Sequence, residues 1–205
     1  MRCLYLVRHG ETSWNAERRL QGRHDVSLSP VGVMQAESLR PVLRAVLGDE
    51  VDRPSVVVSP LRRARQTCEL LGLDDAVVDE RWQEADLGSW TGRTRGELVA
   101  EGNGSYAAWR AGSYSPPGAE PQHELHMRVE AAIADAREGE HVVVVTHGGP
   151  IRAVCRQLLG LRPDHLVPVQ PGSVTVLDLM DSRARLKYFN LAPVVAHQLA
   201  VEPSD

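Results

Sequence analysis

Residues 3–12 of the chain read CLYLVRHGET, and residues 142–149 read VVVVTHGG. In each stretch an apolar run ends in polar residues and glycine, which predicts a buried strand that stops at a turn. His9 and His147 are therefore expected at the carboxyl ends of two strands. Because ligands bind at this edge in open α/β sheets, the two histidines mark the expected site.

The rest of the chain alternates strand-like and helical patterns. Strand-like runs cover residues 3–7, 55–58, 76–78, 141–145, 173–179 and 185–190. Helical patterns cover residues 30–48, 60–71, 93–101, 105–111, 120–138 and 150–160. This alternation predicts an α/β fold, a three-layer α/β/α sandwich with a mostly parallel sheet of about six strands and an antiparallel hairpin at its edge. We expect one domain over residues 1–205, with a loosely held tail after Pro193.

Composition narrows the possible classes of protein. The net charge is −4, and Lys187 is the only lysine among 23 basic residues. An acidic, arginine-rich chain does not predict a nucleic-acid surface, but it suits the capture of phosphate or carboxylate groups. The three cysteines are far apart within apolar or helical patterns, so they are expected to be buried, reduced thiols. No leader or apolar stretch of about 20 residues is evident, which predicts a soluble cytoplasmic protein without a membrane segment.

Polar side chains from several strand ends are expected to surround the histidines. Arg8 precedes His9, Arg62 follows the second strand, and Glu84 follows the third. The guanidinium groups of Arg8 and Arg62 can hold phosphate oxygens and neutralise charge in the transition state. A neutral imidazole at His9 can attack phosphorus in line and carry the phosphoryl group covalently. On the helix that starts near residue 60, we expect Arg62 to point inward and Arg63 and Arg65 to face solvent.

The leaving alkoxide needs a proton, and Glu84 is a candidate donor. A partly buried carboxyl group beside a phosphate dianion prefers to keep its proton. Asp86 lies close enough along the chain to compete for this role. His147, if protonated, would donate a hydrogen bond to the equatorial oxygens. No metal or other cofactor is expected, because His123 and His126 lack a third ligand at suitable spacing.

Several of these segments carry a resemblance to a known family. Residues 6–12 with Asn15, residues 59–67 (SPLRRARQT) and residues 146–149 resemble the three motifs of the histidine phosphatase superfamily, also called phosphoglycerate mutase-like. Glu84, Gly88, Trp90 and Gly92 resemble the segment that holds its acid. The resemblance implies that His9 is the phosphorylated nucleophile and Glu84 the proton donor, without a metal. It also implies a phosphate and substrate pocket lined by Arg8, Asn15, Gln21, Gly22, Arg62, His147 and Gly148.

The predicted activity is hydrolysis of a small phosphate monoester through a phosphohistidine on His9. The alternative is a phosphoglycerate mutase, which transfers the phosphoryl group within a phosphoglycerate. Mutases of the family that this chain resembles are typically longer, with an insertion after the acid segment that closes over the site. Only about fifty residues separate Gly92 from His141 here, which favours the phosphatase. A non-catalytic phosphate-binding module is a third hypothesis, disfavoured because His9 and Glu84 are both present. The loop at residues 112–121 is a candidate lid or substrate wall, and the apolar strand at residues 173–179 with its hairpin could pair two subunits in a homodimer.

Overall fold

The computed structural model describes residues 2–136, 138–181 and 183–193. Its sheet has the strand order β3-β2-β4-β1-β5-β6. The strands are β1 (Arg2–Arg8), β2 (Ser55–Val58), β3 (Val77–Val78), β4 (His141–Thr146), β5 (Ser173–Leu179) and β6 (Ala184–Leu191). Strands β3, β2, β4 and β1 run parallel, β5 runs antiparallel to β1, and β6 runs antiparallel to β5. The predicted α/β fold with an antiparallel edge hairpin is confirmed, and the tail expected to be loose lies outside the described residues.

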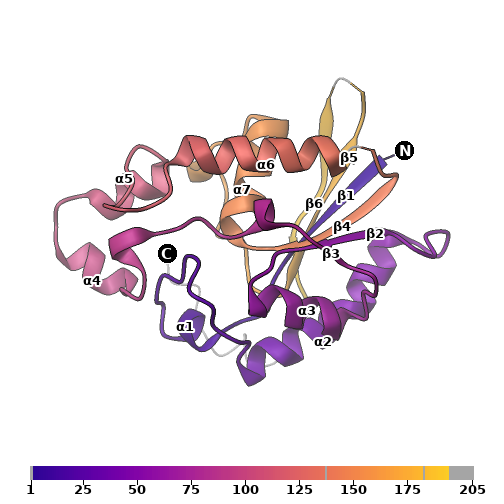
Figure 1. Ribbon diagram of the computed structural model, residues 1–205, viewed down its shortest axis with the longest axis horizontal. Coiled ribbons are helices and arrows are strands. Elements are labelled where there is room, and N and C mark those ends of the chain that lie inside the picture. The colour runs from indigo at the N-terminus through magenta and orange to yellow at the C-terminus, as the bar shows by residue number, and fades with distance from the viewer. Residues whose placement is uncertain (1, 137, 182, 194–205) are drawn as a thin grey trace.

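Helices cover both faces of this sheet (Figure 1). They are α1 (Ser13–Ala16), α2 (Pro30–Leu47), α3 (Arg62–Leu71), α4 (Arg95–Ala100), α5 (Ser105–Ala111), α6 (Gln122–Ala136) and α7 (Gly148–Leu159), with short 3-10 turns η1 (Glu80–Trp82), η2 (Gly88–Trp90) and η3 (Pro163–His165). In Figure 1, α2 and α3 lie below the sheet, α6 and α7 lie above it, and α4 and α5 extend to one side. Helix α3 begins two residues later than expected, because Leu61 keeps an extended backbone as its N-cap.

The central strands β1 and β4 carry continuous apolar runs, residues 3–7 and 142–145, because both of their faces are buried. Leu4 and Leu6 of β1 pack with residues of α6 and α7, whereas Tyr5 and Val7 pack with residues of α2 and α3. Side chains alternate between the two faces of a strand, so a strand covered on both sides needs a continuous apolar run. The same rule accounts for the valines of β4, and it places the polar ends of β1 and β4 at one edge of the core.

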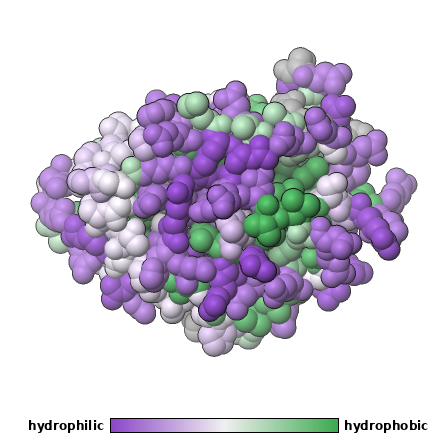
Figure 2. Space-filling model, in the orientation of Figure 1, coloured by the Kyte–Doolittle hydropathy of each residue, from purple (hydrophilic) through white to green (hydrophobic). Residues whose placement is uncertain are grey.

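The two outer strands of the sheet differ in what they expose. All seven residues of β5 are buried between β1 and β6, so only the hairpin strand β6, and not the apolar side chains of β5, can form the pairing edge expected from the sequence. The free edge at this end is β6, which exposes Arg185, Lys187 and Tyr188. At the opposite edge, Val77 and Val78 of β3 are 64% and 50% exposed. Figure 2 shows a compact hydrophobic patch on an otherwise mostly hydrophilic face, in the region where Figure 1 places β3.

Within the described part of the chain, no helix combines the length and the apolar character needed to cross a membrane.

The turn after β1 depends on a close backbone contact with α2. A Cβ on Gly32 would lie 2.0 Å from the carbonyl oxygen of Glu11 and 2.8 Å from its nitrogen. Both are backbone atoms, so no side-chain rotation can relieve the clash. We expect Gly32→Ala to lower the free energy of unfolding by about 3 kcal/mol, as measured by urea denaturation.

The matched control is Gly96→Ala, in the exposed part of α4. There the nearest atom to a new Cβ is Thr94 Oγ1, 3.9 Å away. This variant should gain about 0.5–1 kcal/mol of stability, because alanine favours helix over glycine. Equal stabilities for the Gly32 and Gly96 variants would contradict the contact between the turn and α2.

Candidate active site

The two predicted histidines meet at the carboxyl ends of neighbouring strands. Strands β1 and β4 are parallel neighbours, with Arg8 in register with Thr146. His9 and His147 follow directly, and their ring centroids are 5.0 Å apart. The backbone N–H of His9 donates to the carbonyl oxygen of Thr146 at 3.1 Å. The register of the sheet therefore sets the distance between the two imidazoles, and both side chains are buried.

Arg63 joins these two imidazoles from α3. Its Nε–H donates to Nε2 of His9 at 3.2 Å and to Nδ1 of His147 at 3.3 Å. Its Nη1 and Nη2 donate to the carbonyl oxygens of His24 and Gly22, both at 2.8 Å. Only 1% of Arg63 is exposed, so this arginine supplies the guanidinium group expected after β2.

Arg62 lies outside the site, so the prediction that it turns inward is wrong. Its side chain is exposed, its backbone N–H donates to Asp25 Oδ1 at 2.7 Å, and its Nη1 contacts Ser27 Oγ at 3.4 Å. Because α3 begins at Arg62, its buried face carries Arg63, Ala64, Thr67, Cys68 and Leu71. Arg62 and Arg65 lie on the other face of the helix and are exposed. The expectation that Arg65 faces solvent is confirmed, whereas the same expectation for Arg63 is wrong, because Arg63 is buried.

Hydrogen bonds assign the tautomers of both histidines. Nδ1 of His9 lies 2.7 Å from the carbonyl oxygen of Gly10, so it carries the proton and Nε2 keeps its lone pair. Nε2 of His147 lies 2.8 Å from Ser59 Oγ, while its Nδ1 accepts from Arg63. Burial, followed by the positive charges of Arg63 and Arg8, holds the pKa of His9 well below its usual range, and burial and Arg63 do the same to His147. From the sequence we considered a protonated His147 that donates a hydrogen bond. In the structure its ring is neutral, and its Nδ1 accepts the hydrogen bond from Arg63.

These low pKa values make folding sensitive to acid. In the unfolded chain an imidazole takes up a proton near pH 6.5, but the buried rings of His9 and His147 resist protonation until lower pH. Below pH 6.5 the unfolded state therefore binds more protons, and the free energy of unfolding should fall by up to about 1.4 kcal/mol per imidazole for each pH unit. Urea denaturation at pH 7.5 and 5.5 measures this loss.

Two variants test the origin of that acid sensitivity. His147→Gln should reduce the difference in stability between the two pH values. His123→Gln should leave the difference unchanged, because this side chain is exposed on α6 and meets similar solvent in both states. A difference in stability that is the same in His147→Gln as in the unsubstituted protein would exclude the buried ring as its source.

Arg8 approaches the histidines from β1. Its Nη1 donates to the carbonyl oxygen of Val169, and among the described residues its buried Nε has no hydrogen-bond partner. Burial lowers the pKa of Arg8 to about 10, opposed by the negative charge of Glu84. Gln21 is also buried, and its Oε1 likewise has no partner in the described residues. A phosphate ester would satisfy both groups, since its oxygens accept and its hydroxyl substituents donate.

Glu84 and Asp86 are held in different ways. The Glu84 carboxylate accepts from the N–H of Ala85 at 2.9 Å and from the N–H of Gly149 at 3.1 and 3.2 Å. It therefore sits at the N-terminus of α7, where a helix favours negative charge. Its charge acts on Arg8 and Arg63. Asp86 instead accepts from the N–H of Gly88 at 2.9 Å and closes a turn.

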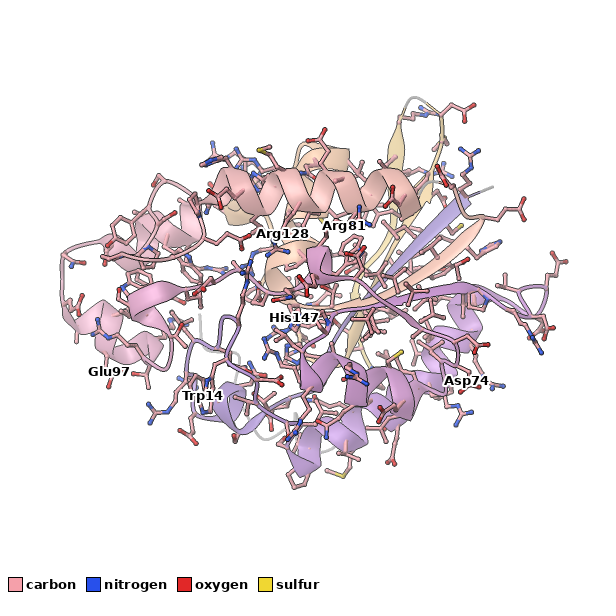
Figure 3. All side chains as sticks on the ribbon, viewed as in Figure 1. Trp14, Asp74, Arg81, Glu97, Arg128 and His147 are labelled. Carbon is pink, nitrogen blue, oxygen red and sulfur yellow. The ribbon has the colours of Figure 1, made fainter. Side chains whose placement is uncertain are left out.

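Arg128 of α6 holds the segment that contains Glu84. Its Nη1 donates to the carbonyl oxygens of Arg81 at 2.6 Å and Gln83 at 2.9 Å, and its Nη2 donates to that of Glu84 at 3.2 Å. The Glu120 carboxylate binds the same guanidinium group in a bidentate manner, at 2.6 and 2.9 Å. Figure 3 shows Arg128 near Arg81, above His147. Glu120 is thus engaged within the protein, where it fixes the acid segment.

A cavity of about 230 Å³ opens over these groups. Its lining includes most of the predicted site residues, namely Arg8, His9, Asn15, Gln21, Gly22, Glu84 and Gly148, together with Arg63. Arg62 lines a different surface cavity, and His147 is fully buried behind the wall. Ser115, Pro116 and Ala119 place the loop at residues 112–121 in the wall. In the described residues, no three His, Cys, Asp or Glu side chains gather so as to hold a metal ion.

The sequence interpretation missed three arginines of this region. Arg63 carried a readable signal, because residues 63, 67 and 71 share one helical face with apolar neighbours. Arg128 and Arg152, which also lies in the cavity wall, carried no local signal. Their positions depend on how α6 and α7 pack against the acid segment, which no pattern within either helix indicates.

The arrangement defines a class of protein, an α/β phosphoryl-transfer enzyme with a neutral imidazole in a cage of guanidinium groups. A family model described as the histidine phosphatase superfamily (branch 1) matches residues 4–192. The chain belongs to the histidine phosphatase superfamily.

Individual relatives agree with this assignment. A glucosyl-3-phosphoglycerate phosphatase of Mycobacterium tuberculosis is 35% identical over 176 residues, which cover 78% of this chain and 76% of that protein. A protein of Enterobacter sp. named as a probable phosphoglycerate mutase is 34% identical over 166 residues, covering 77% of this chain and 75% of the relative. The structure of a mycobacterial glucosyl-3-phosphoglycerate phosphatase with VO3 matches with a TM-score of 0.81 at 32% identity, covering 93% of this chain and all of that one. The predicted family, fold and phosphatase class are confirmed.

Proposed function

We propose that this protein is a metal-independent phosphatase that hydrolyses a small phosphate monoester through a phosphohistidine on Nε2 of His9. One observation carries the proposal. Nε2 of His9 keeps its lone pair at the base of a cavity lined by the guanidinium groups of Arg8 and Arg63. A neutral nucleophile surrounded by cations suits attack on a dianionic phosphate.

In the first step, Nε2 of His9 forms a bond to phosphorus while the bond from phosphorus to the ester oxygen breaks. The N–H group of Arg63 that now contacts Nε2 transfers its hydrogen bond to a phosphate oxygen. The same phosphate and substrate pocket is lined by Arg8, Asn15, Gln21, Gly22 and Gly148, and His147 supports Arg63 from behind its wall. Glu84, whose carboxyl group lines the same cavity, gives its proton to the departing alkoxide.

In the second step, the Glu84 carboxylate takes a proton from a water molecule that attacks the phosphohistidine. The bond between nitrogen and phosphorus breaks, inorganic phosphate leaves, and His9 returns to its neutral form. Glu84 is a better candidate donor than Asp86, because Glu84 lies close enough to the phosphate cage for its charge to act on Arg8 and Arg63.

The test is phosphate release from a panel of small esters that includes 3-phosphoglycerate, in the presence of EDTA. Release that EDTA leaves unchanged supports a metal-independent phosphatase. Conversion of 3-phosphoglycerate into 2-phosphoglycerate without phosphate release would instead establish the mutase reaction.

We further propose that the protein works in the cytoplasm, without nucleic-acid partners. Cys3, Cys68 and Cys155 are buried and form no disulfide within the described part of the chain, and burial raises the pKa of the Cys68 and Cys155 thiols to about 11. Such protonated thiols suit a reducing compartment. A homodimer would pair through β6, the exposed edge strand, and light scattering during gel filtration measures its presence.

A further inference from the structure

Three arginines line the cavity without taking part in the proposed phosphate cage, and one of them, Arg19, pairs with Glu17. The other two are Arg110 and Arg152. Arg152 projects from α7 and Arg110 from the short helix α5, and both line the cavity. Within the described residues, Arg152 makes no hydrogen bond or ion pair. Burial lowers its pKa, the nearby positive charge of Arg110 lowers it further, and the negative charge of Glu84 opposes both effects. The fold thus places two guanidinium groups together in one wall.

Charge balance indicates that this wall needs an anion. Glu84 is the carboxylate whose charge acts on Arg8, Arg63 and Arg152. A phosphate dianion offsets Arg8 and Arg63, and Glu84 must be protonated to act as the donor. Arg152 then lacks a counter-charge, with Arg110 close by. A buried cation without an anion is costly, so a second negative group on the ligand would bind there favourably.

The distance between Arg8 in the phosphate cage and Arg152 limits the size of the ligand. A Cβ on Gly148 would lie 3.5 Å from Nη1 of Arg152 and 3.9 Å from Nη1 of Arg8, so these two nitrogens are at most about 7.4 Å apart. A short carbon skeleton with an anion at each end spans such a gap. Tyr106 and Trp109 of α5 line the same part of the cavity and pack with centroids 5.7 Å apart. They present an aromatic surface to the skeleton.

We propose that Arg152 and Arg110 form a second anion subsite, so that the substrate is a small phosphate monoester carrying another anionic group, either a carboxylate or a second phosphate. This inference rests on the proposed function, because it takes the first phosphate to occupy the cage around His9. It assigns α5 and α7 to substrate selection and leaves the chemical step to His9, Arg63 and Glu84.

Binding tests the subsite without turnover. Calorimetry in the His9→Ala background compares two matched pairs, 3-phosphoglycerate with glycerol 3-phosphate, and fructose 1,6-bisphosphate with fructose 6-phosphate. We expect tighter binding of the member with the extra anion in at least one pair, and the pair that responds identifies a carboxylate or a phosphate. Adding Arg152→Met or Arg110→Met should weaken binding of that member by about 30-fold and of its neutral partner by less than about threefold. Arg65→Met, on the exposed face of α3, is the control and should change neither.

Two results would overturn the subsite. One is equal affinity for both members of each pair, and the other is an equal loss for both members in the Arg152 variant. The second result would mean that Arg152 acts on Glu84 or on the fold, and a shifted pH profile of kcat would accompany it in the His9-containing enzyme. The proposed function fails separately, when the unsubstituted protein releases no phosphate from any ester although the binding preference is present.

Discussion

His9→Ala is expected to lower kcat for phosphate ester hydrolysis by about 10⁴-fold or more. The variant removes the atom that forms the bond to phosphorus, and no neighbour replaces it. His147 is the other imidazole at hand, but its Nδ1 accepts from Arg63 and its Nε2 contacts Ser59. Its ring is also fully buried behind the cavity wall. Continuous measurement of phosphate release on the preferred ester gives the ratio of rates.

The control for His9 is His123→Ala, an exposed position of α6, which should retain full activity. The protein is allowed to react briefly with a labelled ester, the reaction is quenched rapidly, and acid-stable and acid-labile phosphate on the protein are compared. A phosphohistidine is lost in acid, so acid-labile label that depends on His9 is the expected result. Unchanged turnover in His9→Ala would reject the covalent mechanism.

Arg63→Met should lower kcat/KM by about 10³-fold, while Arg62→Met should change it by less than about twofold. Arg63 is the guanidinium group within hydrogen-bond distance of both imidazoles, and it would neutralise charge on the transferring phosphoryl group. Arg62 precedes it by one residue, yet its side chain lies at the surface near Asp25 and Ser27. Steady-state kinetics of the two variants on one ester measure the contrast.

Arg63→Lys is a further comparison, and we expect it to recover little of the lost activity. A lysine ammonium is a point charge, whereas Arg63 divides its donors among His9, His147 and two carbonyl oxygens. Circular dichroism should show folded protein for each variant. A larger loss in Arg62→Met than in Arg63→Met would reverse the assignment of the phosphate-binding arginine.

The strands were predictable from the sequence because a strand that is buried on both faces needs a continuous run of apolar residues. Both faces of β1 and β4 are covered by helices, so residues 3–7 of β1 and residues 142–145 of β4 form continuous apolar runs that end in polar residues. The order of strands and helices then restricts the topology, since parallel strands need helical crossovers between them. The predicted positions of His9 and His147 follow from the same reasoning.

The choice between Arg62 and Arg63 shows where local reasoning is weakest. Successive residues of a helix are rotated by about 100°, so an error of one position exchanges the buried and the exposed side chain. The pattern at residues 63, 67 and 71 indicated the buried face, but it depends on where the helix begins. Leu61 sets that start, because its backbone is extended and its N–H donates to Ser59 Oγ at 3.4 Å in the preceding turn.

The sequence by itself determined the α/β class and the strand ends that carry His9 and His147, because each depends on burial patterns within one segment. The tertiary structure alone decided the tautomers of the histidines, the clamp that Arg128 places on the acid segment, and the meeting of Arg110 with Arg152. These depend on contacts between segments far apart in the chain, as between α6 and the residues after β3. A hydrogen bond or a buried charge is defined by its neighbours, and folding brings those neighbours together.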